Sequence, residues 1–89
     1  MSSHFNLFHM SNKYPIAAMI RYHRQIAGLT QKELGDLAGT GKTVIFDIEK
    51  GKMTVQMDTL IKILDALNIS VEFTSPIMDE FKSRENVNS

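Results

Sequence analysis

The chain has no cysteine, no long apolar run and no excess of either charge, and each absence narrows its class. Without cysteine there is neither a disulfide framework nor a thiolate metal site, so we expect the reducing environment of the cytoplasm. No stretch reaches the roughly 18 apolar residues needed to cross a bilayer, and the first residues show no signal-peptide pattern, which predicts neither membrane insertion nor export. Eighty-nine residues limit the chain to a single domain with a small core.

The zero net charge hides an uneven distribution. Lys and Arg number 10, as do Asp and Glu, over the whole chain. From residue 13 to residue 52 there are seven basic residues against four acidic ones, and from residue 53 to the end three against six. A basic half beside an acidic half is typical of a protein with one face that meets nucleic acid.

The basic half contains the stretch LTQKELGDLAGTGKTVIFDIEKGK, residues 29–52. Thr30 is a natural N-cap, and Glu33 three residues later completes a capping box. Gly39 suits a sharp turn, because glycine accepts a positive φ at little cost. A second apolar pattern then runs to Gly51, a residue that commonly ends a helix. Two short capped helices joined by a glycine turn predict a helix-turn-helix.

Two features of this stretch define how its helices should sit. Gly35 has no side chain, which allows the helices to cross closely. Val44, Ile45 and Ile48 recur at helical spacing, so we expect them to face inward from the second helix. The N-cap of that helix is Gly41, which offers no side-chain oxygen and is therefore a weak cap.

Helical patterns also lie on either side of this stretch. Pro15 suits the first turn of a helix that Gly28 should end, with an inward stripe that includes His23. We interpret His23 as a residue at the edge of the core, because no other ligand type lies at metal-binding spacing. Arg21 and Arg24 are expected on the opposite side, facing either phosphate or solvent. A later stripe predicts a further core helix, through Met57, Leu60, Ile61, Leu64 and Leu67.

The remaining segments are assigned from composition and alternation. Residues 1–14 are expected to be a flexible N-terminal segment, and residues 15–75 a DNA-binding domain. Within that domain Val71 and Phe73 alternate with polar residues, which predicts a strand at 70–74. One strand is not stable alone, so we expect it to pair with a second copy of the chain, with Val71 and Phe73 in the dimer interface. The polar tail, residues 76–89, is predicted to be disordered.

Particular residues of this stretch resemble the helix-turn-helix of the Cro/phage-repressor (XRE) family. They are Gln31, Gly35, Gly39, Ile45, Ile48 and the closing Glu49-Lys50-Gly51-Lys52. The likeness spans about residues 15–74, and the sequence GTGKTVIFDIEKGK is similar to that of HipB-like antitoxins. The resemblance implies an all-α, compact four-to-five-helix, lambda-repressor-like fold. It also implies a homodimer that binds double-stranded operator DNA and a HipA-type kinase toxin, with or without an additional small subunit.

The DNA-reading residues follow from which side of the second helix is left uncovered. We expect Lys42, Thr43, Phe46 and Asp47 to face the major groove. Gln31 should meet a phosphate at the start of the first helix, and Lys50 and Lys52 should meet phosphates beyond the second. Phe46 has the alternative of packing on a neighbouring helix of the same chain or on its dimer mate. Many family members carry Arg, Asn or Gln in place of Asp47, so this carboxylate either reads a base amine or keeps its distance from the phosphates.

Three functions compete on this sequence. The first is a dimeric repressor that is also the antitoxin of a toxin–antitoxin operon. The second is a stand-alone repressor or restriction-controller-like regulator, and the third is a helix-turn-helix used only as a protein adaptor. The net positive charge of residues 13–52 and the presence of Lys42 at the start of the second helix argue against the third function. No paired carboxylates, phosphate loop or activated nucleophile can be recognised, so we expect no enzyme, no catalytic residue, no metal site and no cofactor.

Overall fold

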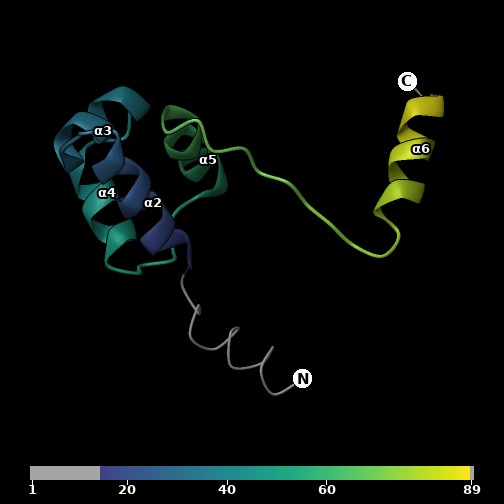
Figure 1. Cartoon of the computed structure of the whole chain (residues 1–89), viewed down its shortest axis with the longest axis horizontal. Helices are drawn as coiled ribbons and strands as arrows, with labels where there is room; N and C mark the ends of the chain where they lie inside the picture. Colours follow the sequence, from purple (N-terminus) through teal and green to yellow (C-terminus); the bar gives the residue numbers. More distant parts are fainter. Residues whose placement is uncertain (1–14, 89) are drawn as a thin grey trace, which may run out of the picture.

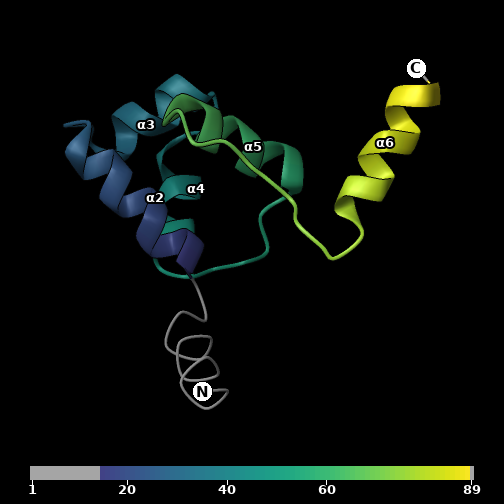
Figure 2. The same cartoon turned by 45° about the vertical axis from the view of Figure 1, so that its right-hand side comes forward.

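The structure, a computed structural model, describes residues 15–88 and folds them into five helices. In chain order these are α2 Pro15–Ile26, α3 Gln31–Ala38, α4 Lys42–Glu49, α5 Met57–Ala66 and α6 Met78–Asn88. Figures 1 and 2 show α2 to α5 gathered into one bundle, with α6 apart from it at the end of an extended segment. The predicted all-α class and the helix-turn-helix at its centre are confirmed.

The core of the bundle is aliphatic and is drawn from all four of its helices. α3 packs against both α4 and α5, while α2 packs against α4. Fully burying an aliphatic side chain of this size contributes about 1.5–3 kcal/mol to folding, so a few such residues dominate the stability of a chain this short. The largest fully buried side chains are those of Ile20, Leu34, Ile45, Ile48 and Ile63.

The local signals that delimit α3 act as the sequence predicts. The Glu33 amide donates to Thr30 Oγ1 at 3.0 Å, and the Thr30 amide donates to Glu33 Oε1 at 2.8 Å, which completes the capping box. At the other end Gly39 has φ 72°, in the left-handed region. Both ends of α3 are therefore fixed by residues that can be recognised in the sequence.

The core side of α5 differs from the stripe that the sequence predicts. Met57 is 64% exposed, whereas Ile63, which the predicted stripe omitted, is completely buried. The apolar residues of α5 form two overlapping stripes that share Leu60, Leu64 and Leu67. Packing against α3 selects the stripe that contains Ile63, and spacing alone does not distinguish the two.

The predicted strand at 70–74 is not formed, and this corrects the fold class given by the sequence. Residues 69–75 are extended but have no strand assignment, and Val71 and Phe73 are exposed. The physical reason is that a strand needs a partner for its backbone N–H and C=O groups. No residue within 15–88 is assigned to a strand that could pair with it.

The predictions for the two ends of the chain compare differently with the structure. The tail was expected to be disordered, and in its place the structure contains α6. The predicted flexible segment at residues 1–14 lies outside the described residues. Within residues 15–88, no helix has the length and apolarity required to span a bilayer.

Candidate nucleic-acid interface

The side of α4 that the core leaves uncovered carries two rows of residues. Lys42, Phe46 and Lys50 are four residues apart and exposed, so they form one row along the helix and its C-cap,. Thr43 and Asp47 form a second row beside it. Ile45 and Ile48 point the other way, into the core. The expected split of α4 into an inner and an outer side is therefore what the structure has.

The placement of α4 relative to α3 depends on a close approach of two backbones. The Gly35 carbonyl accepts hydrogen bonds from the amides of Thr40 at 2.9 Å and Gly41 at 3.2 Å. A Cβ on Gly35 would lie 2.5 Å from the Gly41 carbonyl carbon and oxygen and 2.9 Å from the Lys42 amide nitrogen. Only glycine fits here, and this fixes the start of α4 against α3.

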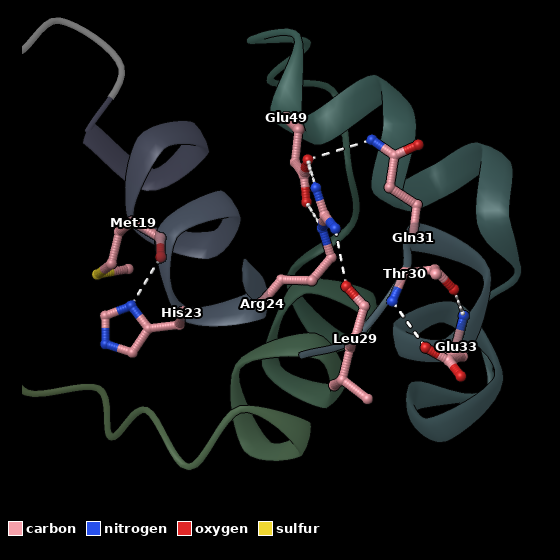
Figure 3. A network of polar contacts seen from close by, with 8 residues as sticks. All are labelled: Met19, His23, Arg24, Leu29, Thr30, Gln31, Glu33 and Glu49. Atoms are coloured by element: carbon pink, nitrogen blue, oxygen red, sulfur yellow. Dashed lines mark hydrogen bonds and ion pairs between the residues drawn. The ribbon is translucent and has the colours of Figure 1, made fainter. Parts of the chain in front are cut away.

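The C-terminal end of α4 is held by a polar network that joins α2, α3 and α4 (Figure 3). Arg24 donates through Nε to Glu49 Oε2 at 2.6 Å and through Nη2 to Glu49 Oε1 at 2.9 Å, a two-pronged pair,. Its Nη1 donates to the Leu29 carbonyl at 2.8 Å, and Gln31 Nε2 donates to Glu49 Oε1 at 3.1 Å. The network thus ties the last turn of α4 to the first turn of α3.

Burial and partners act in opposite directions on the charge of Glu49. Its side chain is 5% exposed and that of Arg24 is 12% exposed. Burial works to raise the pKa of Glu49, but hydrogen bonds from Arg24 and Gln31, with the charges of Arg24 and Arg21, outweigh it and lower the pKa,. The hydrogen bond to Glu49 raises the pKa of Arg24. The pair therefore stays ionised at neutral pH.

This network was missed by the sequence reasoning, which assigned Arg24 to solvent or phosphate. A signal for it exists, because Arg24 lies four residues after Ile20, on the same side of α2. The network also changes the expectation for Gln31. Its side-chain amide is committed to Glu49 within the protein, at the N-terminus of α3 where the phosphate contact was predicted.

Two cations at the C-terminal end of the interface, Lys50 and Lys52, have partners on or near α4. Lys50 Nζ lies 5.0 Å from the centre of the Phe46 ring, a cation–π distance,. Lys52 Nζ lies 3.6 Å from Asp47 Oδ2, and both side chains remain partly exposed. Phe46 is 43% exposed, so it stands on the outer side of α4 and is not buried against a helix of its own chain.

His23 lies outside this interface and takes up the role of a core-edge residue. It is half-buried, and its Nδ1 lies 2.7 Å from the carbonyl oxygen of Met19, one turn earlier in α2. Tyr22 meets its ring edge-on, at 5.7 Å between ring centroids. No cluster of metal-ligand side chains occurs within the part of the chain that the structure describes.

Comparison with known proteins agrees with this geometry. The model of the family described as "Helix-turn-helix" matches residues 20–73. The uncharacterised HTH-type transcriptional regulator y4mF of Sinorhizobium fredii is 36% identical over 61 residues, which are 68% of this chain and 80% of that protein. Control protein C.SmaI of Serratia marcescens is 36% identical over 62 residues, 70% of this chain and 74% of that protein.

Proposed function

The chain belongs to the helix-turn-helix family, and from that premise we propose that it is a sequence-specific DNA-binding transcriptional regulator. The observation that carries the proposal is the outer side of α4. Lys42, Thr43 and Phe46 are exposed there beside each other, while the opposite side of the same helix is anchored in the core. A rigid helix with polar and cationic residues along one side is what a major groove admits.

The uncharged and cationic residues of the interface have the following roles in this proposal. Lys42 donates to the guanine edge, Thr43 contacts a base, and Phe46 packs on a thymine methyl group. Lys50 and Lys52 contact phosphates beyond the end of α4, and the first turn of α3 at Gln31 contacts another. The close contact at Gly35 and the pair of Arg24 with Glu49 keep the two helices at a fixed angle.

The regulator acts as a homodimer in this proposal, because a helix-turn-helix reads a palindromic operator with one helix in each half-site. The extended segment at residues 69–75 is the proposed site of contact between the two copies. It exposes Val71 (44%) and Phe73 (70%), which a soluble monomer would leave in water,. Pairing of this segment with its copy would satisfy its backbone and cover both side chains.

Two biological settings fit such a regulator. In the first, the chain is a HipB-like antitoxin that represses its own operon and binds a HipA-type kinase. This setting rests on the resemblance of the sequence at residues 39–67 to HipB-like antitoxins. In the second, it is a regulator without a toxin, and the similarity to control protein C.SmaI along most of both chains supports this candidate.

Binding to a labelled duplex from immediately upstream of its own gene tests the proposed DNA-binding function. Fluorescence anisotropy should show tighter binding to this duplex than to a shuffled duplex of equal length. Two phosphate-contacting lysines per half-site, four per dimer, predict that affinity falls about a hundredfold between about 50 and about 200 mM salt, because each phosphate contact releases counterions. Equal affinity for both duplexes would refute sequence-specific regulation.

Co-expression separates the two settings. The chain, tagged at one end, is produced together with the product of the adjacent gene and purified through the tag. Recovery of a stoichiometric complex with a kinase-like protein would establish the antitoxin setting. Recovery of the chain alone, beside a soluble kinase-like neighbour, would refute it and leave the regulator without a toxin.

A further inference from the structure

The two carboxylates of α4 lie at opposite edges of its outer side, and each faces a cation from outside the helix. Glu49 is held by Arg24 of α2 and is almost completely buried. Asp47 lies at the other edge, where the Lys52 ammonium approaches it from the loop after α4 at 3.6 Å. Both negative charges of α4 are thus neutralised, and Lys42 remains as the exposed charge at its start.

The two pairs differ in what they do for the fold. The Arg24 pair joins three helices through several short hydrogen bonds. The Lys52 pair is longer, and its side chains are 61% and 35% exposed. Exposed pairs of this kind contribute little to stability, because water and salt screen them. The geometry of this second pair therefore points to a role other than folding.

Asp47 is placed to face a bound duplex. It follows Thr43 by four residues, so the two share one side of α4, and their row lies beside the row that contains Phe46. An unpaired carboxylate at this position would be repelled by the phosphates on either side of a groove. A carboxylate whose charge is offset by Lys52 can approach, and its oxygens accept from the N4 amine of cytosine.

Lys52 can make both contacts at once. Its backbone amide donates to the Asp47 carbonyl at 3.0 Å, which fixes the loop against the end of α4. An ammonium has three N–H donors, so one can be directed to Asp47 while the others remain available for a phosphate.

We propose that Lys52 is a positioning residue that offsets the charge of Asp47 and bridges it to a phosphate, which makes Asp47 the residue that selects cytosine. The inference rests on the proposed DNA-binding function and adds to it that Asp47 requires a cytosine in the bound site. It assigns to Lys52 a larger role than that of a phosphate contact.

A double-mutant cycle tests the proposal. The affinities of wild type, Asp47→Asn, Lys52→Gln and the double variant are measured by anisotropy on the upstream duplex. They are also measured on duplexes that each carry one single-base change in the bound site. Asp47→Asn should abolish discrimination against replacing one particular cytosine, whose replacement costs the wild type about tenfold. Lys52→Gln should weaken binding about tenfold or more in the wild-type background, and much less when Asp47→Asn is also present.

Lys50→Gln is the matched control, because it removes one lysine from the same end of α4 without touching the pair. Its loss of affinity should be the same with and without Asp47→Asn. Melting temperatures of all variants should agree within about 3 °C, as expected for exposed substitutions.

The outcomes are distinct for the two hypotheses. A wild type without preference for any duplex refutes the proposed function, and this inference falls with it. A wild type that binds specifically, with losses from Asp47→Asn and Lys52→Gln that simply add, refutes the coupling alone. A base profile left unchanged by Asp47→Asn refutes the role of Asp47 as a reader.

Discussion

Lys42 occupies the first position of α4, where its positive charge is unfavourable for the helix. Helix N-termini carry a partial positive charge and favour acidic residues, and the preceding Gly41 provides no side-chain cap. No ion pair involving Lys42 is present among the described residues. A residue that costs the fold something and has no internal partner is a good candidate for an external contact.

Lys42→Ala should therefore separate stability from binding. Affinity for the specific duplex should fall by about 1–3 kcal/mol if Lys42 reads a base, whereas the melting temperature should stay the same or rise slightly. Anisotropy on specific and shuffled duplexes, together with thermal unfolding, measures both. Lys32→Ala is the control, since Lys32 lies on α3 in an exposed pair with Asp36. Equal losses on both duplexes would reduce Lys42 to a phosphate contact.

The charge of Glu49 predicts a pH dependence of stability. Because the pKa of Glu49 is lowered in the folded protein, its contribution is complete above the unfolded pKa of about 4.3. It is lost as the pH falls through the lowered value. Glu49→Gln should destabilise the fold at pH 7 by about 1–3 kcal/mol, because the partly buried Arg24 loses its counter-charge.

Thermal or urea unfolding between pH 7 and pH 2 measures this difference. The difference in the free energy of unfolding between wild type and Glu49→Gln should become smaller as the pH falls, since both proteins then lack the negative charge at position 49. Asp36→Asn, in an exposed pair, should show almost no gap at any pH,. A gap that widens toward acid would contradict the assignment.

Residue-level prediction from the sequence succeeded where helical spacing alone decides orientation. Ile45 and Ile48 are buried, and Lys42, Thr43 and Phe46 are exposed, as their spacing on α4 predicts. It failed for Arg24, because a rule that places charges in solvent cannot find a partner 25 residues away. Whether the exposed residues contact DNA remains a prediction.

At the scale of elements, the turn between α3 and α4 depends most on one position. Gly35→Ala introduces a methyl group that would lie 2.5 Å from the Gly41 backbone, and neither backbone can move without shifting α4. We expect the free energy of unfolding to fall by about 1–3 kcal/mol and specific DNA binding to weaken further, since α4 changes its angle.

The neighbouring substitution Asp36→Ala is the control for this prediction. It puts the same residue type on an exposed position of the same helix, and alanine favours helix, so stability should change little. Urea unfolding of both variants gives the comparison. A Gly35→Ala protein as stable as wild type would show that the helices do not meet at this contact.

Capped elements were predictable, and elements that need a partner were not. The capping box and the glycine at the end of α3 are local, so the sequence specifies them completely. Residues 70–74 alternate like a strand, but strand formation depends on a second segment. The polar composition at Met78–Asn88 indicated disorder, although acidic Asp79 and Glu80 at the start of α6 favour its helix,.

For the whole molecule, the central prediction concerns assembly. Val71→Asp would bury an unpaired charge if the extended segments pair, which costs several kcal/mol. Sedimentation should then show monomer at micromolar concentration, and operator affinity should drop because the two half-sites are no longer bound together. Ser70→Asp places the same charge one residue earlier, on the polar side of the alternation, and should remain dimeric. A dimeric Val71→Asp protein would exclude this segment as the interface.

The extended segment between α5 and α6 also acts as a tether. At about 3.3 Å per residue, residues 69–75 span roughly 23 Å, so α6 stays within that reach of the bundle. A molecule that bound the exposed side chains of Phe81 in α6 and Ile77 just before it would be kept by a tether of this length at a millimolar effective concentration around the bundle. A partner with only a weak second contact to α2–α5 would then rebind before it diffuses away, and its residence time would be set by the length of the tether as well as by either surface.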